Sequence, residues 1–173
     1  MKKSQNSKKI IVIDILLMII LFAFDQLTKI LTRTFLGDYH SIKIIPGVLE
    51  FQFLQNRGAM WGMLQGQRVL FILIAVVVFV IMSLLIAIIP RERKYYILDI
   101  CFVMILAGAL GNTYDRIANG YVTDFIYVSL INFPIFNIAD IYITVATILL
   151  MILVIFYYSD EDLQFLNFFG SKK

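Results

Sequence analysis

Four aspartates, Asp25, Asp115, Asp124 and Asp140, lie in or beside long apolar runs of this chain. A charged side chain inside a membrane is costly, so each of them is a candidate functional residue. A helix rises about 1.5 Å per residue, which brings the first, second and fourth aspartates to nearly one level, toward one membrane face. Asp124 belongs to a segment between two runs and can fold back to that level. The sequence therefore predicts a carboxylate cluster near one face.

The rest of the composition limits the chemistry of this cluster. His40 is the only histidine and Cys101 the only cysteine, so a serine or cysteine triad lacks a well-placed base, and a zinc or iron-sulfur site cannot be assembled. Two neighbouring aspartates need neither residue. They share a proton, so that one activates water while the other protonates the substrate. The residues favour hydrolysis by a carboxylate pair without metal or cofactor.

Sequence neighbours divide the four aspartates into two groups. Asp25 precedes Lys29 by four positions, so the two charges can neutralise one another on one helix face. Asp115 is followed by Arg116, which can bind a carboxylate or extend to the membrane interface. A structural role is the preferred interpretation for these four residues. The other two aspartates have no sequence-local counter-charge and form the better catalytic pair.

Two asparagines are expected to orient that pair. Asn137 can cap the helix that follows it, which places Asp140 in the first turn, where the helix dipole favours the ionised form. We therefore predict Asp140 as the principal base and Asp124 as the acid, although the pair titrates as a unit. Asn112 supplies a further amide donor.

Four apolar runs must hold these residues. The chain is 61% hydrophobic and 16% charged, against about 25% charged residues in soluble domains. Each run can reach the roughly 20 residues that cross a bilayer, and continuous rather than alternating apolarity favours helices over a barrel. The sequence predicts an all-α membrane protein, one domain over residues 1–173, with spans at about 10–31, 69–89, 95–117 and 137–158.

Basic residues cluster at both ends of the chain and in the turn at 90–94, which predicts that these parts are cytoplasmic and that segments 33–68 and 118–136 face outward. The net charge of +3 follows from this topology, so no nucleic acid is expected. Two short runs around Pro46-Gly47 predict a small β-sheet. The second outer segment is expected to form a strand, loop or short helix at the membrane interface. The first apolar run lacks a small-residue cleavage site, which favours a retained membrane anchor over a cleaved signal peptide. Asp14 and Asp99 are expected to be solvated near helix ends.

Five ordered blocks carry a resemblance to a known family. They are Asp25-Gln-Leu-Thr-Lys29, Asn56-Arg-Gly-Ala-Met-Trp-Gly62, Gly108-Ala-Leu-Gly-Asn112-Thr-Tyr-Asp115-Arg116, Val122-Thr-Asp124-Phe125 and Phe136-Asn137-Ile-Ala-Asp140. Together they resemble the lipoprotein signal peptidase family, also called signal peptidase II. Each block alone is weak evidence, whereas the ordered set is highly specific.

The resemblance implies an aspartic endopeptidase of the bacterial cytoplasmic membrane. It would remove the signal peptide from diacylglyceryl-modified prolipoproteins, cutting just before the lipidated cysteine. The family's catalytic aspartates fall on Asp124 and Asp140, and a globomycin-type antibiotic would bind over them. The protein is expected to act as a monomer in contact with membrane lipid. Other residues match positions that, in the family, support the active site or line the substrate cavity. They are Asp25, Lys29, Asn56, Gly58, Asn112, Asp115, Arg116 and Asn137.

Two other classes of function stay open. A proton-coupled transporter would place its carboxylates near the bilayer midplane, on broken helices and often in repeated halves, and neither pattern is evident. A non-enzymatic scaffold or lipid-binding subunit accounts for the paired charges at Asp25, Lys29, Asp115 and Arg116. It leaves the other two aspartates and the asparagines without a role.

Overall fold

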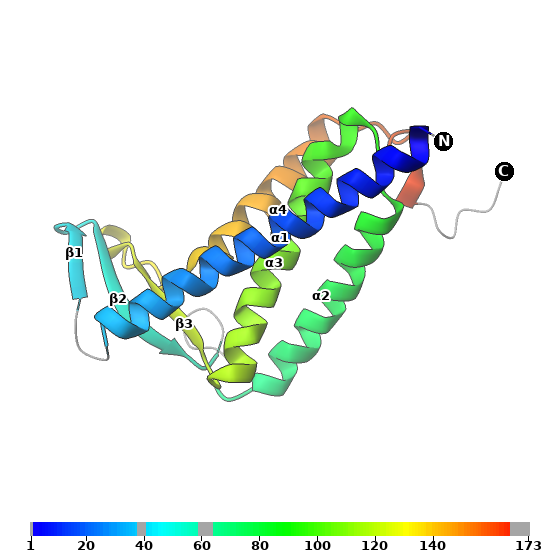
Figure 1. The fold of residues 1–173 in the computed structure, drawn as a ribbon. Coiled ribbons are helices and arrows are strands. Elements are labelled where there is room, and N and C mark those ends of the chain that lie inside the picture. Colours follow the sequence, from blue (N-terminus) through cyan, green and yellow to red (C-terminus); the bar gives the residue numbers. More distant parts are fainter. Residues whose placement is uncertain (1, 38–40, 59–63, 167–173) are drawn as a thin grey trace.

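The computed structural model describes residues 2–37, 41–58 and 64–166. Within these ranges, four helices are long and apolar enough to cross a membrane: α1 (Lys2–Phe35), α2 (Arg68–Ile88), α3 (Tyr96–Ala118) and α4 (Ile138–Phe156). They lie close to the four predicted runs. Figure 1 shows them as one bundle with a small sheet at one end, which confirms the predicted fold class.

Helix α3 is central and contacts α1, α2 and α4. A Cβ atom on Gly108 would lie 2.6 Å from the carbonyl oxygen of Ala139 on α4. A Cβ atom on Gly111 would likewise overlap the carboxylate of Asp25 on α1. Small residues matter here because helices in lipid associate through close van der Waals packing, with little hydrophobic drive between them. The two glycines let α1 and α4 approach the same end of α3.

The sheet is antiparallel and has the strand order β1-β2-β3 among the described residues. Its strands are β1 (Ser41–Ile45), β2 (Leu49–Asn56) and β3 (Val122–Tyr127). The predicted hairpin around Pro46-Gly47 is confirmed, with Ile45 opposite Leu49 and Gly47 at a φ of 73°. The second outer segment contains both a strand and a helical turn, because β3 pairs with β2 and is followed by the 3₁₀ turn η3 (Ser129–Ile131).

Arg91 joins three helices at the opposite end of the bundle, just before the 3₁₀ turn η2 (Arg93–Tyr95). Its Nη1 lies 3.2 Å from Asp14 Oδ2 on α1 and 2.6 Å from Asp99 Oδ2 on α3. Its Nη2 donates to the carbonyl of Ile86 in α2. The expectation that both aspartates are solvated is wrong, since Arg91 covers them and their side chains are 12% and 7% exposed.

Replacing Arg91 with Ala should destabilise the bundle, because it leaves two buried carboxylates without their cation. Breaking a buried ion pair costs about 3–5 kcal/mol, so the thermal unfolding temperature of the purified protein in detergent should fall clearly. Arg93→Ala is the matched control, since it removes a positive charge from the same turn at an exposed position. Equal shifts in the two variants would contradict a specific role for Arg91.

Candidate active site

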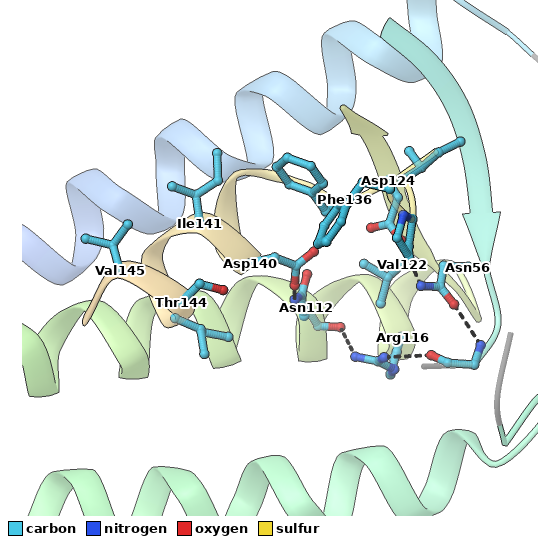
Figure 2. Close-up of a pocket in the computed structure, with 15 residues that line it drawn as sticks. Asn56, Asn112, Arg116, Val122, Asp124, Phe136, Asp140, Ile141, Thr144 and Val145 are labelled. Atoms are coloured by element: carbon cyan, nitrogen blue, oxygen red, sulfur yellow. Dashed lines mark hydrogen bonds between the residues drawn. The ribbon is translucent and has the colours of Figure 1, made fainter. Parts of the chain in front are cut away.

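A cavity of about 390 Å³ lies between the sheet and the neighbouring ends of α3 and α4. Asp124 faces it from β3 and Asp140 from the first turn of α4, as Figure 2 shows. Its other lining residues are Asn56, Gly58, Asn112, Arg116, Val122, Phe133, Pro134, Ile135, Phe136, Ile141, Ile143, Thr144 and Val145. The two aspartates therefore share one largely apolar cavity that also contains amide groups.

The start of α4 fixes Asp140. Asn137 is the N-cap residue, and its side-chain oxygen accepts from the backbone N–H of Asp140 at 3.1 Å. Asp140 Oδ2 in turn accepts from the backbone N–H of Asn137 at 3.1 Å. This reciprocal capping box satisfies two donors that the first helical turn leaves free. The predicted cap is confirmed, and it holds the Asp140 carboxylate at the positive end of the helix dipole.

Asn137 and Asn112 link the two aspartates. Asn137 Nδ2 donates to Asp124 Oδ1 at 2.6 Å and to Asn112 Oδ1 at 3.1 Å. Asn112 Nδ2 donates to Asp140 Oδ1 at 2.8 Å. Asn112 Oδ1 also accepts from Lys29 Nζ at 2.9 Å. Because two donors meet that oxygen, the amide nitrogen of Asn112 must face Asp140.

Asp124 accepts a further hydrogen bond from Asn56 Nδ2, at 2.8 Å to Oδ2. Asp124 is 2% exposed. Burial, followed by the nearby charge of Asp140, raises the pKa of Asp124 to about 7, against the smaller lowering effects of Asn56, Asn137 and Lys29. Near neutral pH this carboxyl group can therefore either hold or release a proton.

Behind the asparagines lies a buried charge cluster. Lys29 Nζ is 2.9 Å from Asp25 Oδ2 and 3.6 Å from Asp115 Oδ2, and all three side chains are fully buried. Asp25 Oδ1 also accepts from the backbone N–H of Ala139 in α4, at 3.0 Å. The predicted Asp25–Lys29 ion pair is confirmed, and Asp115 joins it from α3. One ammonium thus connects α1 and α3 and, through Asp25, α4.

Arg116 has different partners from those expected. Its guanidinium lies 4.5 Å from the ring centroid of Phe71 on α2, an arrangement typical of cation–π contacts. Its Nη1 and Nη2 donate to the carbonyls of Asn112 and Gly58 at 3.4 and 3.3 Å. Asn56 Oδ1 accepts from the N–H of Gly58 at 2.9 Å. Arg116 and Asn56 therefore both bind the backbone of Gly58, which lines the cavity.

Arg33 and Thr123 belong to the same network, although sequence reasoning missed them. Arg33 Nη1 donates to Thr123 Oγ1 at 2.7 Å and lies 3.7 Å from Asp115 Oδ1. Arg33 follows Lys29 by four residues and Asp25 by eight, which places all three on one face of α1. This spacing is the sequence signal that could have identified Arg33. His40 and the stretch 59–62 of the second sequence block lie outside the described residues.

All ten residues singled out from the sequence lie at the sheet end of the bundle. Six of them line the cavity, three form the adjoining charge cluster, and Asn137 joins the two aspartates by hydrogen bonds. In the described ranges, no three His, Cys, Asp or Glu residues are grouped as a metal site requires. Two carboxylates that face one cavity can exchange protons with a molecule bound there.

Known proteins are similar to this chain in sequence and in fold. The chain is 35% identical to a lipoprotein signal peptidase of Enterococcus faecalis over 85% of this chain and 90% of that protein. It is 38% identical to one of Clostridium novyi over 80% and 95%. Two solved structures of a bacterial membrane enzyme superpose with TM-scores of 0.73, at 29% identity over 94% of both chains and at 31% over 86% and 96%.

The match to a family model extends over most of the chain. The model is described as signal peptidase (SPase) II, and it matches residues 17–156, which include all of the residues that line the cavity. With its four apolar helices, the molecule is a multi-pass membrane protein. The chain therefore belongs to the signal peptidase II family of membrane peptidases.

Proposed function

We propose that this chain is an aspartic endopeptidase that removes the signal peptide from diacylglyceryl-modified prolipoproteins, cutting just before the lipidated cysteine. The observation that carries the proposal is the pair Asp124 and Asp140 in one cavity, joined by Asn137, which bonds to both. The substrate class is supported by the relatives, which are lipoprotein signal peptidases. Neither metal nor cofactor takes part in this mechanism.

Asp140 acts as the principal base in the proposed mechanism. Its position in the first turn of α4 and its two hydrogen-bond donors, Asn112 Nδ2 and the Asn137 N–H, favour the ionised form. It takes a proton from water, which attacks the scissile carbonyl carbon. Asp124, whose raised pKa keeps it partly protonated, donates to the carbonyl oxygen. Asp140 then gives its proton to the leaving nitrogen while Asp124 takes a hydroxyl proton from the tetrahedral intermediate, so the C–N bond breaks and both carboxyl groups return to their starting states.

The other residues position this pair. Asn56, Asn112 and Asn137 orient the carboxylates, and Arg116 and Gly58 line the substrate cavity. Lys29, Asp25 and Asp115 hold the surrounding helices in place.

We further propose that the sheet end faces outward and that both termini are cytoplasmic, in the cytoplasmic membrane of a bacterium. The basic turn with Arg91, Arg93 and Lys94 lies at the other end of the bundle, as the positive-inside rule requires. The scissile bond of a lipidated precursor would then lie at the depth of the cavity. The chain acts as a single domain and a monomer in contact with lipid, and a globomycin-type inhibitor would bind over the aspartate pair.

Asp124→Asn and Asp140→Asn should each slow cleavage severely, because Asn has a similar shape but cannot exchange the proton. Proton transfer by a positioned side chain is worth about 10²–10⁴-fold in rate, so we expect at least about 10²-fold lower kcat. The assay is cleavage of a diacylglyceryl-modified prolipoprotein by purified protein in lipid, with unmodified precursor alongside. Asp160→Asn, at an exposed site beyond α4, is the matched control. Native rates in both active-site variants would exclude the aspartic mechanism.

The pH profile should report the protonated form of the pair. Because Asp124 must hold a proton and its pKa is about 7, kcat/KM should fall as the pH rises through 7. Asn56→Ala removes a donor that favours ionised Asp124, so its pKa should rise and the alkaline limb should move to higher pH. Initial rates of the native protein and of Asn56→Ala, measured from about pH 5 to about pH 9, test both expectations. A limb that moves to lower pH in Asn56→Ala would contradict this assignment.

A further inference from the structure

We propose that Thr123 is a positioning residue for Asp124 and that Arg33 acts through it. This inference rests on the proposed function, in which Asp124 is one of the two catalytic carboxylates. Neither the hydroxyl of Thr123 nor the guanidinium of Arg33 lines the cavity. Their influence on the reaction would therefore pass through the backbone of β3.

Thr123 is attached to two helices at once. Its backbone N–H donates to Asp115 Oδ2 on α3 at 2.8 Å. Its Oγ1 accepts from Arg33 Nη1 on α1 at 2.7 Å. Thr123 is fully buried, whereas the Arg33 side chain is 25% exposed. Because Asp115 also lies 3.7 Å from Arg33, the three residues form a closed clamp between α1, α3 and β3.

Strand geometry transmits this clamp to Asp124. Successive side chains of a strand point to opposite faces. Val122 and Asp124 line the cavity, whereas Thr123 between them does not. Anchoring Thr123 on the helix side therefore sets the direction in which Asp124 points, while Asn56 and Asn137 bind its carboxylate from the cavity side.

The ladder between β2 and β3 is irregular on the Ile126 side of Asp124. The register between β2 and β3 shifts between Phe51 and Leu54, and Leu54 is the residue that pairs with Asp124. An irregularity of this kind bends a strand and interrupts its ladder. Thr123 itself pairs in register with Gln55, so the clamp adds an anchor on the helix side, next to the interrupted stretch.

The clamp should affect kcat and leave KM unchanged. Misplacing a catalytic group by about 1 Å can cost about 10²-fold in rate. An interaction that matters only in the transition state lowers kcat and kcat/KM together. Thr123→Val keeps the shape of the side chain but cannot accept the hydrogen bond from Arg33. We expect it to lower kcat about tenfold, with KM within about twofold of native.

Two variants separate positioning from mere packing. Thr123→Ser keeps the hydroxyl and should recover most of kcat, although it removes a methyl group. Thr32→Val makes the same chemical change at a buried threonine of α1 whose hydroxyl donates only to the carbonyl of Thr28, at 2.8 Å. It should keep the native kcat. Each variant is assayed on lipidated prolipoprotein after thermal unfolding shows a native-like transition.

A double-mutant cycle tests the route through Arg33. Arg33→Met removes the donor and keeps the aliphatic stem. If the Arg33 guanidinium acts through the hydroxyl of Thr123, the double variant Arg33→Met/Thr123→Val should have a kcat no lower than that of the slower single variant. Multiplying effects would overturn the coupling, and native kcat in Thr123→Val, or equal losses in Thr123→Ser, would overturn the positioning role. Asp124→Asn is assayed in parallel, because native activity there would overturn the proposed function itself.

Discussion

An ammonium group buried within a membrane-spanning bundle costs several kcal/mol unless other charges and hydrogen bonds compensate it. Lys29 meets this condition with the carboxylates of Asp25 and Asp115 and the amide oxygen of Asn112. These partners come from α1 and α3, and Asp25 also accepts from the backbone of α4. Satisfying one buried cation therefore fixes the relative heights and rotations of three helices.

The geometry of the proposed catalytic pair depends on that arrangement. Lys29 occupies the oxygen of Asn112, so the amide nitrogen of Asn112 is directed to Asp140. The amide nitrogen of Asn137 is likewise directed to Asp124, while the amide oxygen of Asn137 caps the helix that carries Asp140. Each asparagine therefore has one fixed orientation. Hydrogen bonds thus hold both aspartates in place, which in the proposed mechanism would reduce the reorganisation that the reaction requires.

Polar contacts define both ends of the bundle, while its middle is apolar. Arg91 joins α1, α2 and α3 at one end, and Lys29 joins α1, α3 and α4 at the other. Lipid provides little hydrophobic drive for helices to associate, so close packing at Gly108 and Gly111 and these buried ionic contacts select one arrangement. At the sheet end, Lys29 also binds Asn112, which lines the cavity.

The sequence alone determined the features that depend on local spacing. Continuous apolar runs place the helices, Pro46-Gly47 turns the hairpin, four-residue spacing pairs Asp25 with Lys29, and an asparagine three residues before Asp140 caps α4.

Tertiary structure alone decided contacts between residues far apart in the chain. Arg116 stacks on Phe71 instead of binding a carboxylate, Arg91 covers two aspartates, and β3 joins the hairpin with Thr123 clamped by Arg33. Such contacts depend on how helices rotate and how closely they approach, which short-range periodicity does not encode.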